Sequence, residues 1–166
     1  EGRTLYVVNK EGAAQSSLRT AQPSIRYDAL GDFYKAGLAN FALGGTFNSR
    51  INLNLREDKG YTYGARSGFN GGPELGSFNV STEVNKDATA ASITEVLNEL
   101  QSYAAAGMDE AEYDYMRSAI GQRDALLGEA KCLSYLGRHG EAIAILDEVE
   151  RLGTWYMGDT YYWRAW

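Results

Sequence analysis

The sequence predicts an α+β fold in which helices cover one face of an antiparallel sheet. Residues 61–69 and 78–84 alternate apolar and polar positions, and the run Asn70-Gly71-Gly72-Pro73 between them predicts a turn, so the two stretches form a hairpin. Residues 87–106 repeat their apolar side chains every three to four positions, which predicts a helix with one apolar face. A sheet with one such face and a helix with one such stripe bury each other.

The N-terminal part predicts two strands and a helix. Residues 4–9, TLYVVN, form a short apolar run that is typical of a buried strand. Residues 15–21 alternate weakly and are expected to pair with that run until Pro23 ends the strand. Residues 27–43 carry apolar side chains at roughly helical spacing. We therefore expect a helix that leads into the centre of the chain.

The centre of the chain, LGGTFNSRINLNLREDKGYTYGARSGF over residues 43–69, predicts a helix, a tight turn and a strand in close succession. Gly44-Gly45-Thr46 is expected to turn into a short helix over residues 51–56, which Gly60 ends. One face of the following strand is expected to hold Tyr61, Tyr63, Ala65, Ser67 and Phe69. In such a corner Arg56 leaves the last helical turn as Tyr63 enters the strand, so a guanidinium and a phenol can converge.

The C-terminal part reads as helical. Asn85 or Asp87 caps the helix over residues 87–106, Gly107 ends it, and a further helix is expected over residues 109–122. Beyond these, small and apolar residues follow the pattern of a helical repeat at Leu126, Ala130, Leu133, Gly137, Ala142, Leu146 and Val149. This tail resembles one tetratricopeptide repeat. We expect an α+β domain over residues 1–122 and a helical segment over residues 123–166.

A family resemblance rests on the central stretch and covers about residues 4–126. The matching residues are Leu43-Gly44-Gly45, Phe47, Ser49-Arg50, Leu55-Arg56-Glu57, Lys59-Gly60 and Tyr61-Thr62-Tyr63-Gly64. The pattern resembles the C-terminal, non-catalytic half of the pitrilysin-type zinc peptidases, in its bacterial form. That family includes insulin-degrading enzyme and the mitochondrial processing peptidase. The domain over residues 1–122 is incomplete relative to the family.

The resemblance implies roles for two residues of the corner. In the family, the residues that match Arg56 and Tyr63 contact the substrate carbonyl beside a metal that the other half holds. Donors fixed where negative charge develops stabilise an oxyanion, and the two side chains suit this chemistry. The structural alternative is that Arg56 pairs with Glu57 or Asp58 and that Tyr63 is half-buried in the strand.

Two further stretches are candidates for contact with substrate. Gly44, Gly45, Thr46 and Phe47 are expected to form a turn and to line a bound peptide. They do not suit a phosphate-binding loop, since no Lys-Ser or Lys-Thr follows them. Gln15-Ser16 resembles an edge-strand position of the family, where an extended peptide can add as a further strand.

The chain does not carry the residues of a complete zinc site. The family's catalytic half has His-x-x-Glu-His on one helix, whereas His139 is the single histidine of this sequence. Zinc favours nitrogen and sulfur ligands, so carboxylates alone do not replace the missing imidazoles. We expect no cofactor in this chain, zinc in a partner chain or domain, and no complete enzyme without that partner.

Composition narrows the function further. The net charge of −6 and a pI of about 4.8 argue against a nucleic-acid surface, and no apolar run reaches the length of a membrane span. By resemblance alone, the location is periplasmic or otherwise extracytoplasmic. The preferred hypothesis is a non-catalytic, peptide-binding half or subunit of a zinc peptidase, in a heterodimer with the catalytic one. The alternative is a degenerate peptidase-like domain that binds a partner protein through its helical tail.

Overall fold

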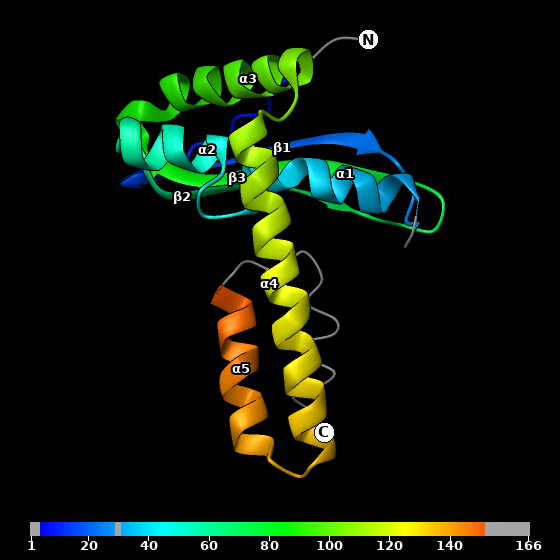
Figure 1. Ribbon diagram of the computed structural model, residues 1–166. Helices are drawn as coiled ribbons and strands as arrows, with labels where there is room; N and C mark the ends of the chain where they lie inside the picture. The colour runs from blue at the N-terminus through cyan, green and yellow to red at the C-terminus, as the bar shows by residue number, and fades with distance from the viewer. Residues whose placement is uncertain (1–3, 29–30, 152–166) are drawn as a thin grey trace.

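The computed structural model describes residues 4–28 and 31–151, and a three-stranded antiparallel sheet lies at the centre of the fold (Figure 1). The strands are β1 (Gln15–Ser24), β2 (Thr62–Asn70) and β3 (Gly76–Asn85), in the order β1-β3-β2. The predicted hairpin is therefore confirmed as β2 and β3, with β3 in the middle of the sheet.

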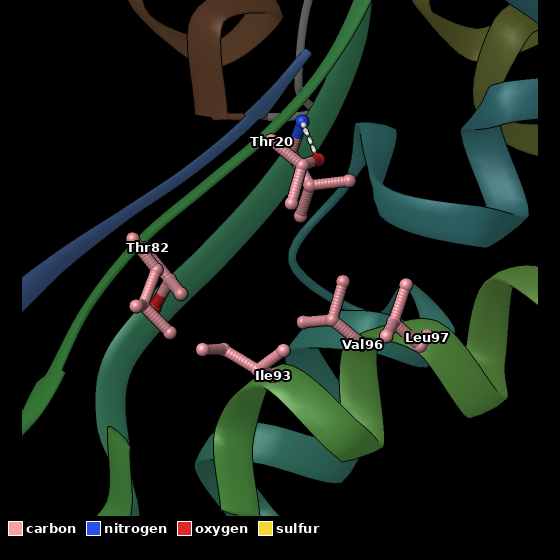
Figure 2. Close-up of a pocket in the computed structure, with 7 residues that line it drawn as sticks. Thr20, Thr82, Ile93, Val96 and Leu97 are labelled. Atoms are coloured by element: carbon pink, nitrogen blue, oxygen red, sulfur yellow. Dashed lines mark hydrogen bonds between the residues drawn. The ribbon is translucent and has the colours of Figure 1, made fainter. Parts of the chain in front are cut away.

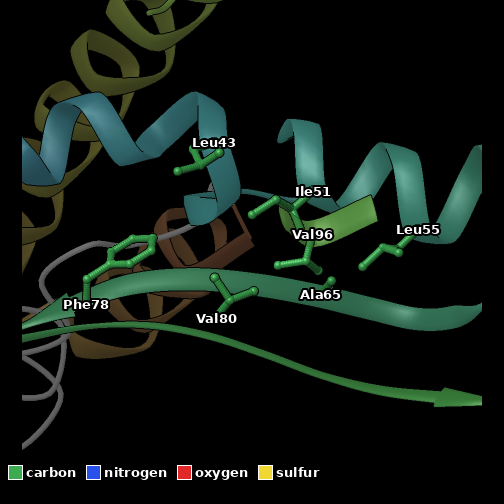
Figure 3. Close-up of a cluster of buried hydrophobic side chains, with 7 residues drawn as sticks. All are labelled: Leu43, Ile51, Leu55, Ala65, Phe78, Val80 and Val96. Carbon is green, nitrogen blue, oxygen red and sulfur yellow. The ribbon is translucent and has the colours of Figure 1, made fainter. Parts of the chain in front are cut away.

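Strand β3 gives the sheet its apolar face. Its buried side chains alternate with more exposed ones, and they are those of Phe78, Val80, Thr82 and Val84, as the sequence predicted. The helices α1 (Asp32–Asn40), α2 (Arg50–Asn52) and α3 (Thr89–Ala106) lie over this face. The main buried cluster between helices and sheet consists of Leu43, Ile51, Leu55, Ala65, Phe78, Val80 and Val96 (Figure 3). The predicted α+β class is confirmed.

Helix α3 ends where the sequence indicated and begins at Thr89, two residues later than predicted. The Asn85 side chain accepts a hydrogen bond of 3.1 Å from the Asp87 backbone N–H, and this caps the short 3₁₀ turn η3 (Lys86–Ala88) that precedes α3. Gly107 follows the helix with φ +73°, a backbone conformation that glycine adopts at little cost. The Asn85 cap thus sets the start of η3, and Gly107 sets the end of α3.

The N-terminal strand prediction is wrong. Residues 4–10 form no strand, and the side chains of residues 5–8 are 73–92% exposed. An apolar run forms a strand only where a neighbouring strand offers its backbone groups, and among the described residues β1 pairs with β3 instead. Strand β1 also continues past Pro23, which did not end it, because an edge strand tolerates a residue without an N–H.

The helix predicted over residues 27–43 is shorter and changes its geometry. Helix α1 begins at Asp32 and continues as the π-helical turn η1 (Phe41–Gly45), while Leu30 lies outside the described residues. Gly44-Gly45 therefore ends a helical stretch rather than forming a tight turn. Residue 44 must be glycine because η1 lies very close to β2. A Cβ on Gly44 would lie 2.6 Å from the Ser67 backbone nitrogen, so only glycine lets η1 approach β2 this closely.

The C-terminal part forms a helical hairpin. Helix α4 (Glu110–Tyr135) does not end near Gln122 but runs on for a further thirteen residues, because no strong helix breaker interrupts it. The chain then turns at Gly137, which has φ +74°, into α5 (His139–Arg151), and α5 packs along the C-terminal half of α4 (Figure 1). The turn is closed by hydrogen bonds from Gly137 N–H to Ser134 O and from Arg138 N–H to Leu133 O.

The buried side chains of the hairpin are among those the repeat pattern selected, at Ala130, Ala142, Leu146 and Val149. Residues 152–166 of the predicted helical segment lie outside the described residues. Since α4 passes through residues 122 and 123 without a break, the predicted domain division stays a prediction. In the described part of the chain, no helix is long and apolar enough to cross a membrane.

Candidate functional site

The corner between α2 and β2 has the helix, turn and strand that the sequence predicted. Helix α2 continues as the π-helical turn η2 (Leu53–Asp58), and Gly60 follows it with φ +64°. The corner closes where the Tyr61 N–H donates to Leu55 O at 2.8 Å. Leu55, which directly precedes Arg56, and Ala65, which lies two residues after Tyr63, are both buried in the main cluster (Figure 3). The backbone on both sides of the corner is thus anchored to the core.

Arg56 is held by an aromatic ring. Its guanidinium carbon lies 4.3 Å from the centre of the Phe47 ring, and Phe47 itself is 59% exposed. The Nη1 atom lies 3.3 Å from Glu57 Oε1, within ion-pair range, but it is buried and makes no hydrogen bond. The ion pair of the structural alternative is therefore present, yet its geometry leaves the N–H groups of Nη1 without an acceptor.

Tyr63 points away from the core. The expected alternation holds for Ala65 and Ser67, which are buried, but Tyr63 is 90% exposed. The register of β2 against β3 shifts between Thr62 and Ala65, and Gly64 O is bonded by side-chain hydroxyls of the Thr62 and Thr82 residues. Such a bulge re-aims a side chain. Tyr63 was therefore placed on the wrong face by the sequence pattern, and it is not half-buried either.

Two buried asparagines, which the sequence reasoning missed, fasten β2 to the helices. Asn52 Oδ1 accepts from the Ala65 N–H at 2.9 Å, and Asn52 Nδ2 donates to Phe47 O at 2.7 Å. Asn40 Nδ2 donates to Ser67 O at 2.9 Å, and Asn40 Oδ1 accepts from the Ser67 hydroxyl. These bonds occupy backbone groups on the outer edge of β2, so this part of the edge is closed to a further strand.

An ion pair fixes the start of α2. The Arg50 guanidinium donates to both carboxylate oxygens of Glu112, with Nη2 2.7 Å from Oε2, and also to Gly107 O at 3.1 Å. Its carbon lies 4.9 Å from the centre of the Tyr103 ring. The hydrogen bonds with Glu112 raise the pKa of Arg50, while burial raises the pKa of Tyr103. Because Glu112 lies at the start of α4, this pair holds the corner against the α3–α4 junction.

The residues predicted to line a peptide differ in access. Gly44 and Thr46 are buried, and the Thr46 hydroxyl donates to Phe41 O at 3.3 Å. Gly45 is half-buried, and of the four only Phe47 is exposed. The Gly44–Phe47 stretch therefore serves mainly as packing, with Phe47 at the surface.

Gln15 and Ser16 begin strand β1 at the same end of the sheet as the corner. Ser16 and Thr62 both pair with Val84, from opposite sides of β3, which separates their strands by about 10 Å. Gln15 is exposed, while the Ser16 hydroxyl accepts from Thr89 Oγ1 at 2.7 Å. The outer edge of β1 has no strand beside it among the described residues.

A small apolar cavity of about 40 Å³ lies between the sheet and α3 (Figure 2). It is lined by Leu18, Thr20, Val80, Thr82, Ile93, Val96 and Leu97. The Thr20 hydroxyl already accepts from the Val80 N–H at 3.3 Å, so the cavity offers few free polar groups. Its size suits about one water molecule and excludes an organic cofactor.

The described residues also contain no group of three His, Cys, Asp or Glu side chains that could hold a metal ion. His139 lies at the start of α5 and is exposed, on a different element from the corner. Residues 4–28 and 31–151 therefore offer no fitting site for a zinc ion, which the resemblance assigns to a partner chain or domain.

These features define an α+β domain in which helices cover one face of a three-stranded antiparallel sheet and a helix–turn–strand corner carries Arg56 and Tyr63. Residues 1–120 match the family model described as the peptidase M16 inactive domain, and the chain therefore belongs to this family. The resemblance to the non-catalytic half of the pitrilysin-type peptidases is thereby confirmed. No curated protein matches the sequence significantly.

A solved structure supports the same assignment. The crystal structure of a peptidase M16 inactive domain from Pseudomonas fluorescens is similar to this chain with a TM-score of 0.59 and 26% sequence identity. The similarity covers 90% of this chain and 32% of the other, so this chain spans about a third of that structure's length. The family match ends inside α4 and assigns nothing to the helical tail.

Proposed function

We propose that this chain is the non-catalytic, substrate-contacting part of a zinc peptidase, and that it supplies Arg56 and Tyr63 to a site whose zinc is held by another chain or domain. The observation that carries the proposal is the corner. Its backbone is anchored in the core, while Arg56 is stacked on Phe47 and Tyr63 is turned out into solvent at a bulge.

The chemistry of the two side chains is complementary. A guanidinium keeps its charge at any physiological pH, and a phenolic hydroxyl donates one directional hydrogen bond. Both can donate to the carbonyl oxygen of a peptide as negative charge develops on it, and one such donor is worth about 3 kcal/mol of transition-state stabilisation. The Arg56 side chain is 32% exposed although its Nη1 atom is buried, so its exposed part would make this contact.

The peptide itself would run along β1. An extended chain can add to an open sheet edge through backbone hydrogen bonds. Asn52 and Asn40 occupy groups on the outer edge of β2, whereas Gln15 and Ser16 begin an edge that no described strand covers. This favours an unfolded peptide as the substrate. One part of it would add to β1, and another part would extend across the end of the sheet to the corner and Phe47, since β1 and β2 lie on opposite sides of β3.

The first experiment compares Tyr63→Phe with Tyr34→Phe in a reconstituted complex with a chain that carries His-x-x-Glu-His. Loss of the hydroxyl donor should lower kcat by about 100-fold and change KM by no more than roughly twofold. Tyr34, which is 48% exposed on α1, is the control for adding a phenylalanine to the surface. Unchanged turnover of Tyr63→Phe would remove the catalytic assignment.

A second candidate function is partner binding through the helical hairpin. The hairpin of α4 and α5 extends away from the sheet (Figure 1), and Leu136 at its tip is 71% exposed. In this case no catalytic partner restores peptidase activity, and deletion of residues 123–166 abolishes association. Activity in the reconstituted complex that survives this deletion would decide for the first function.

A further inference from the structure

One buried side chain contacts both segments that carry the proposed site. Asn52 is 3% exposed, and both ends of its carboxamide are hydrogen-bonded: the oxygen accepts from the Ala65 N–H, and the nitrogen donates to Phe47 O. The first bond reaches strand β2 two residues after Tyr63. The second reaches the loop before α2, whose Phe47 ring lies under the Arg56 guanidinium.

We propose that Asn52 is a positioning residue that fixes the spacing between Arg56 and Tyr63. It lies one helical turn before Arg56 and cannot touch a substrate, because it is buried below the corner. It acts through its neighbours: Phe47 restrains the guanidinium, and Ala65 restrains the strand that follows the bulge. The proposal deepens the proposed function and rests on it.

The requirement for asparagine follows from the two bonds. The asparagine carboxamide accepts from an N–H with its oxygen and donates to a carbonyl oxygen with its nitrogen, so its two terminal atoms serve two separate partners. Aspartate keeps the acceptor for Ala65 and loses the donor for Phe47. Leucine has the same branched shape, although it is larger, and it keeps neither bond, so both segments lose their common restraint.

Asn40 provides a matched control. It is also a buried asparagine on a helix, and its carboxamide also makes two hydrogen bonds. Both of its bonds go to Ser67, two residues beyond Ala65, and neither involves Phe47. A purely structural role predicts that Asn40 and Asn52 variants behave alike, whereas a positioning role predicts that they differ.

The test measures kcat and KM of the reconstituted complex for Asn52→Leu, Asn52→Asp and Asn40→Leu, at a temperature where all are folded. We expect kcat of Asn52→Leu to fall by about 10- to 100-fold with little change in KM, since small misplacements of reacting groups cost this much. Asn52→Asp should fall between Asn52→Leu and the unmodified chain. Asn40→Leu should keep kcat within roughly twofold.

A partner-free measurement accompanies the kinetics. In NMR spectra of the full chain, Asn52→Leu should shift the Arg56 Nε–H resonance and speed hydrogen exchange at the Ala65 amide, and Asn40→Leu should change neither. If Asn52→Leu does not fold, Asn52→Asp is compared with Asn40→Asp by the same criteria.

The outcomes separate the inference from the proposed function. Equal losses of kcat in the Asn52 and Asn40 variants, or no loss in either, would overturn the positioning role while Tyr63→Phe remains impaired. Normal turnover of Tyr63→Phe would instead overturn the proposed function, and the role of Asn52 with it.

Discussion

Replacing Gly44 with alanine should destabilise the domain, because η1 crosses β2 too closely for a side chain. An added Cβ would lie 2.6 Å from the Ser67 backbone nitrogen and 2.8 Å from the Ser67 Cβ. Real Cβ atoms essentially never approach other heavy atoms below 3.0 Å. A rotamer change cannot relieve the contact with the backbone nitrogen, so η1 and β2 must move apart.

The magnitude follows from two opposing effects. Overpacking of a core costs about 1–3 kcal/mol, and a contact with backbone belongs at the upper end of this range. Alanine in a helical position contributes about 1 kcal/mol in its favour relative to glycine. We therefore expect the free energy of unfolding to fall by about 2 kcal/mol. In a chain of this length that corresponds to a decrease in melting temperature of about 4–8 °C.

The assay is thermal and urea unfolding followed by circular dichroism, with Gly121→Ala as the control. Gly121 lies inside α4 with no atom within 4 Å of an added Cβ, so its alanine variant should be more stable by up to about 1 kcal/mol. Adding Ser67→Gly to Gly44→Ala should restore part of the lost free energy of unfolding, because it removes the contact with the Ser67 side chain but not the contact with the backbone nitrogen. A Gly44→Ala variant as stable as Gly121→Ala would refute the close approach.

Two further predictions concern charged pairs. Glu112→Gln keeps an acceptor for the Asp109 N–H at the start of α4 but leaves Arg50 without its carboxylate. The free energy of unfolding measured in urea should therefore fall by about 2 kcal/mol. An unchanged free energy of unfolding would mean that the ion pair is not formed in solution. Hydrogen bonds from Ser17 and then Arg19 lower the pKa of Glu83 below its ordinary value of 4.5. The stability that this pairing contributes is present above the ordinary pKa and is lost as the pH falls through the lowered one. The stability of Glu83→Gln should therefore depend less on pH below about 4.5 than that of the unmodified chain, and identical acid unfolding curves would contradict this.

The elements that the sequence located well are those with a strong local pattern. The two-residue alternation of β3 placed Phe78 and Val80 inward, Asn85 marked the start of the helical stretch that opens with η3, and Gly107 marked the end of α3. The run over residues 4–9 failed because its composition favours a strand while strand formation depends on a partner elsewhere. The predicted end of α4 was wrong for a related reason. The sequence changes in character at Arg123, but a helix that contains no proline is not interrupted by such a change.

The candidate site also depends on contacts between distant parts of the chain, which the local sequence pattern does not reveal. The order of residues predicted a helix–turn–strand corner with Arg56 and Tyr63 on either side, and the corner is present. Alternation could not reveal that Tyr63 faces solvent, because a bulge depends on pairing with β3 rather than on the residues of β2 alone. It could not single out Asn52 either. A buried asparagine one helical turn before Arg56 was the available signal, but its partners lie five and thirteen residues away.

The orientation of Tyr63 is difficult to explain by stability alone. A tyrosine that continued the alternation of β2 would lie beside Ala65 on the core face, and burying a ring of this size stabilises a fold by about 2 kcal/mol. The chain instead breaks the register, leaves the ring 90% exposed and bonds the displaced Gly64 carbonyl with the Thr62 and Thr82 hydroxyls. Bulges and π-helical turns are both frequent beside functional sites, and here η2 carries Arg56 while the bulge carries Tyr63. The two local irregularities lie on either side of one corner, and the role in substrate contact that we propose for Arg56 and Tyr63 would account for both.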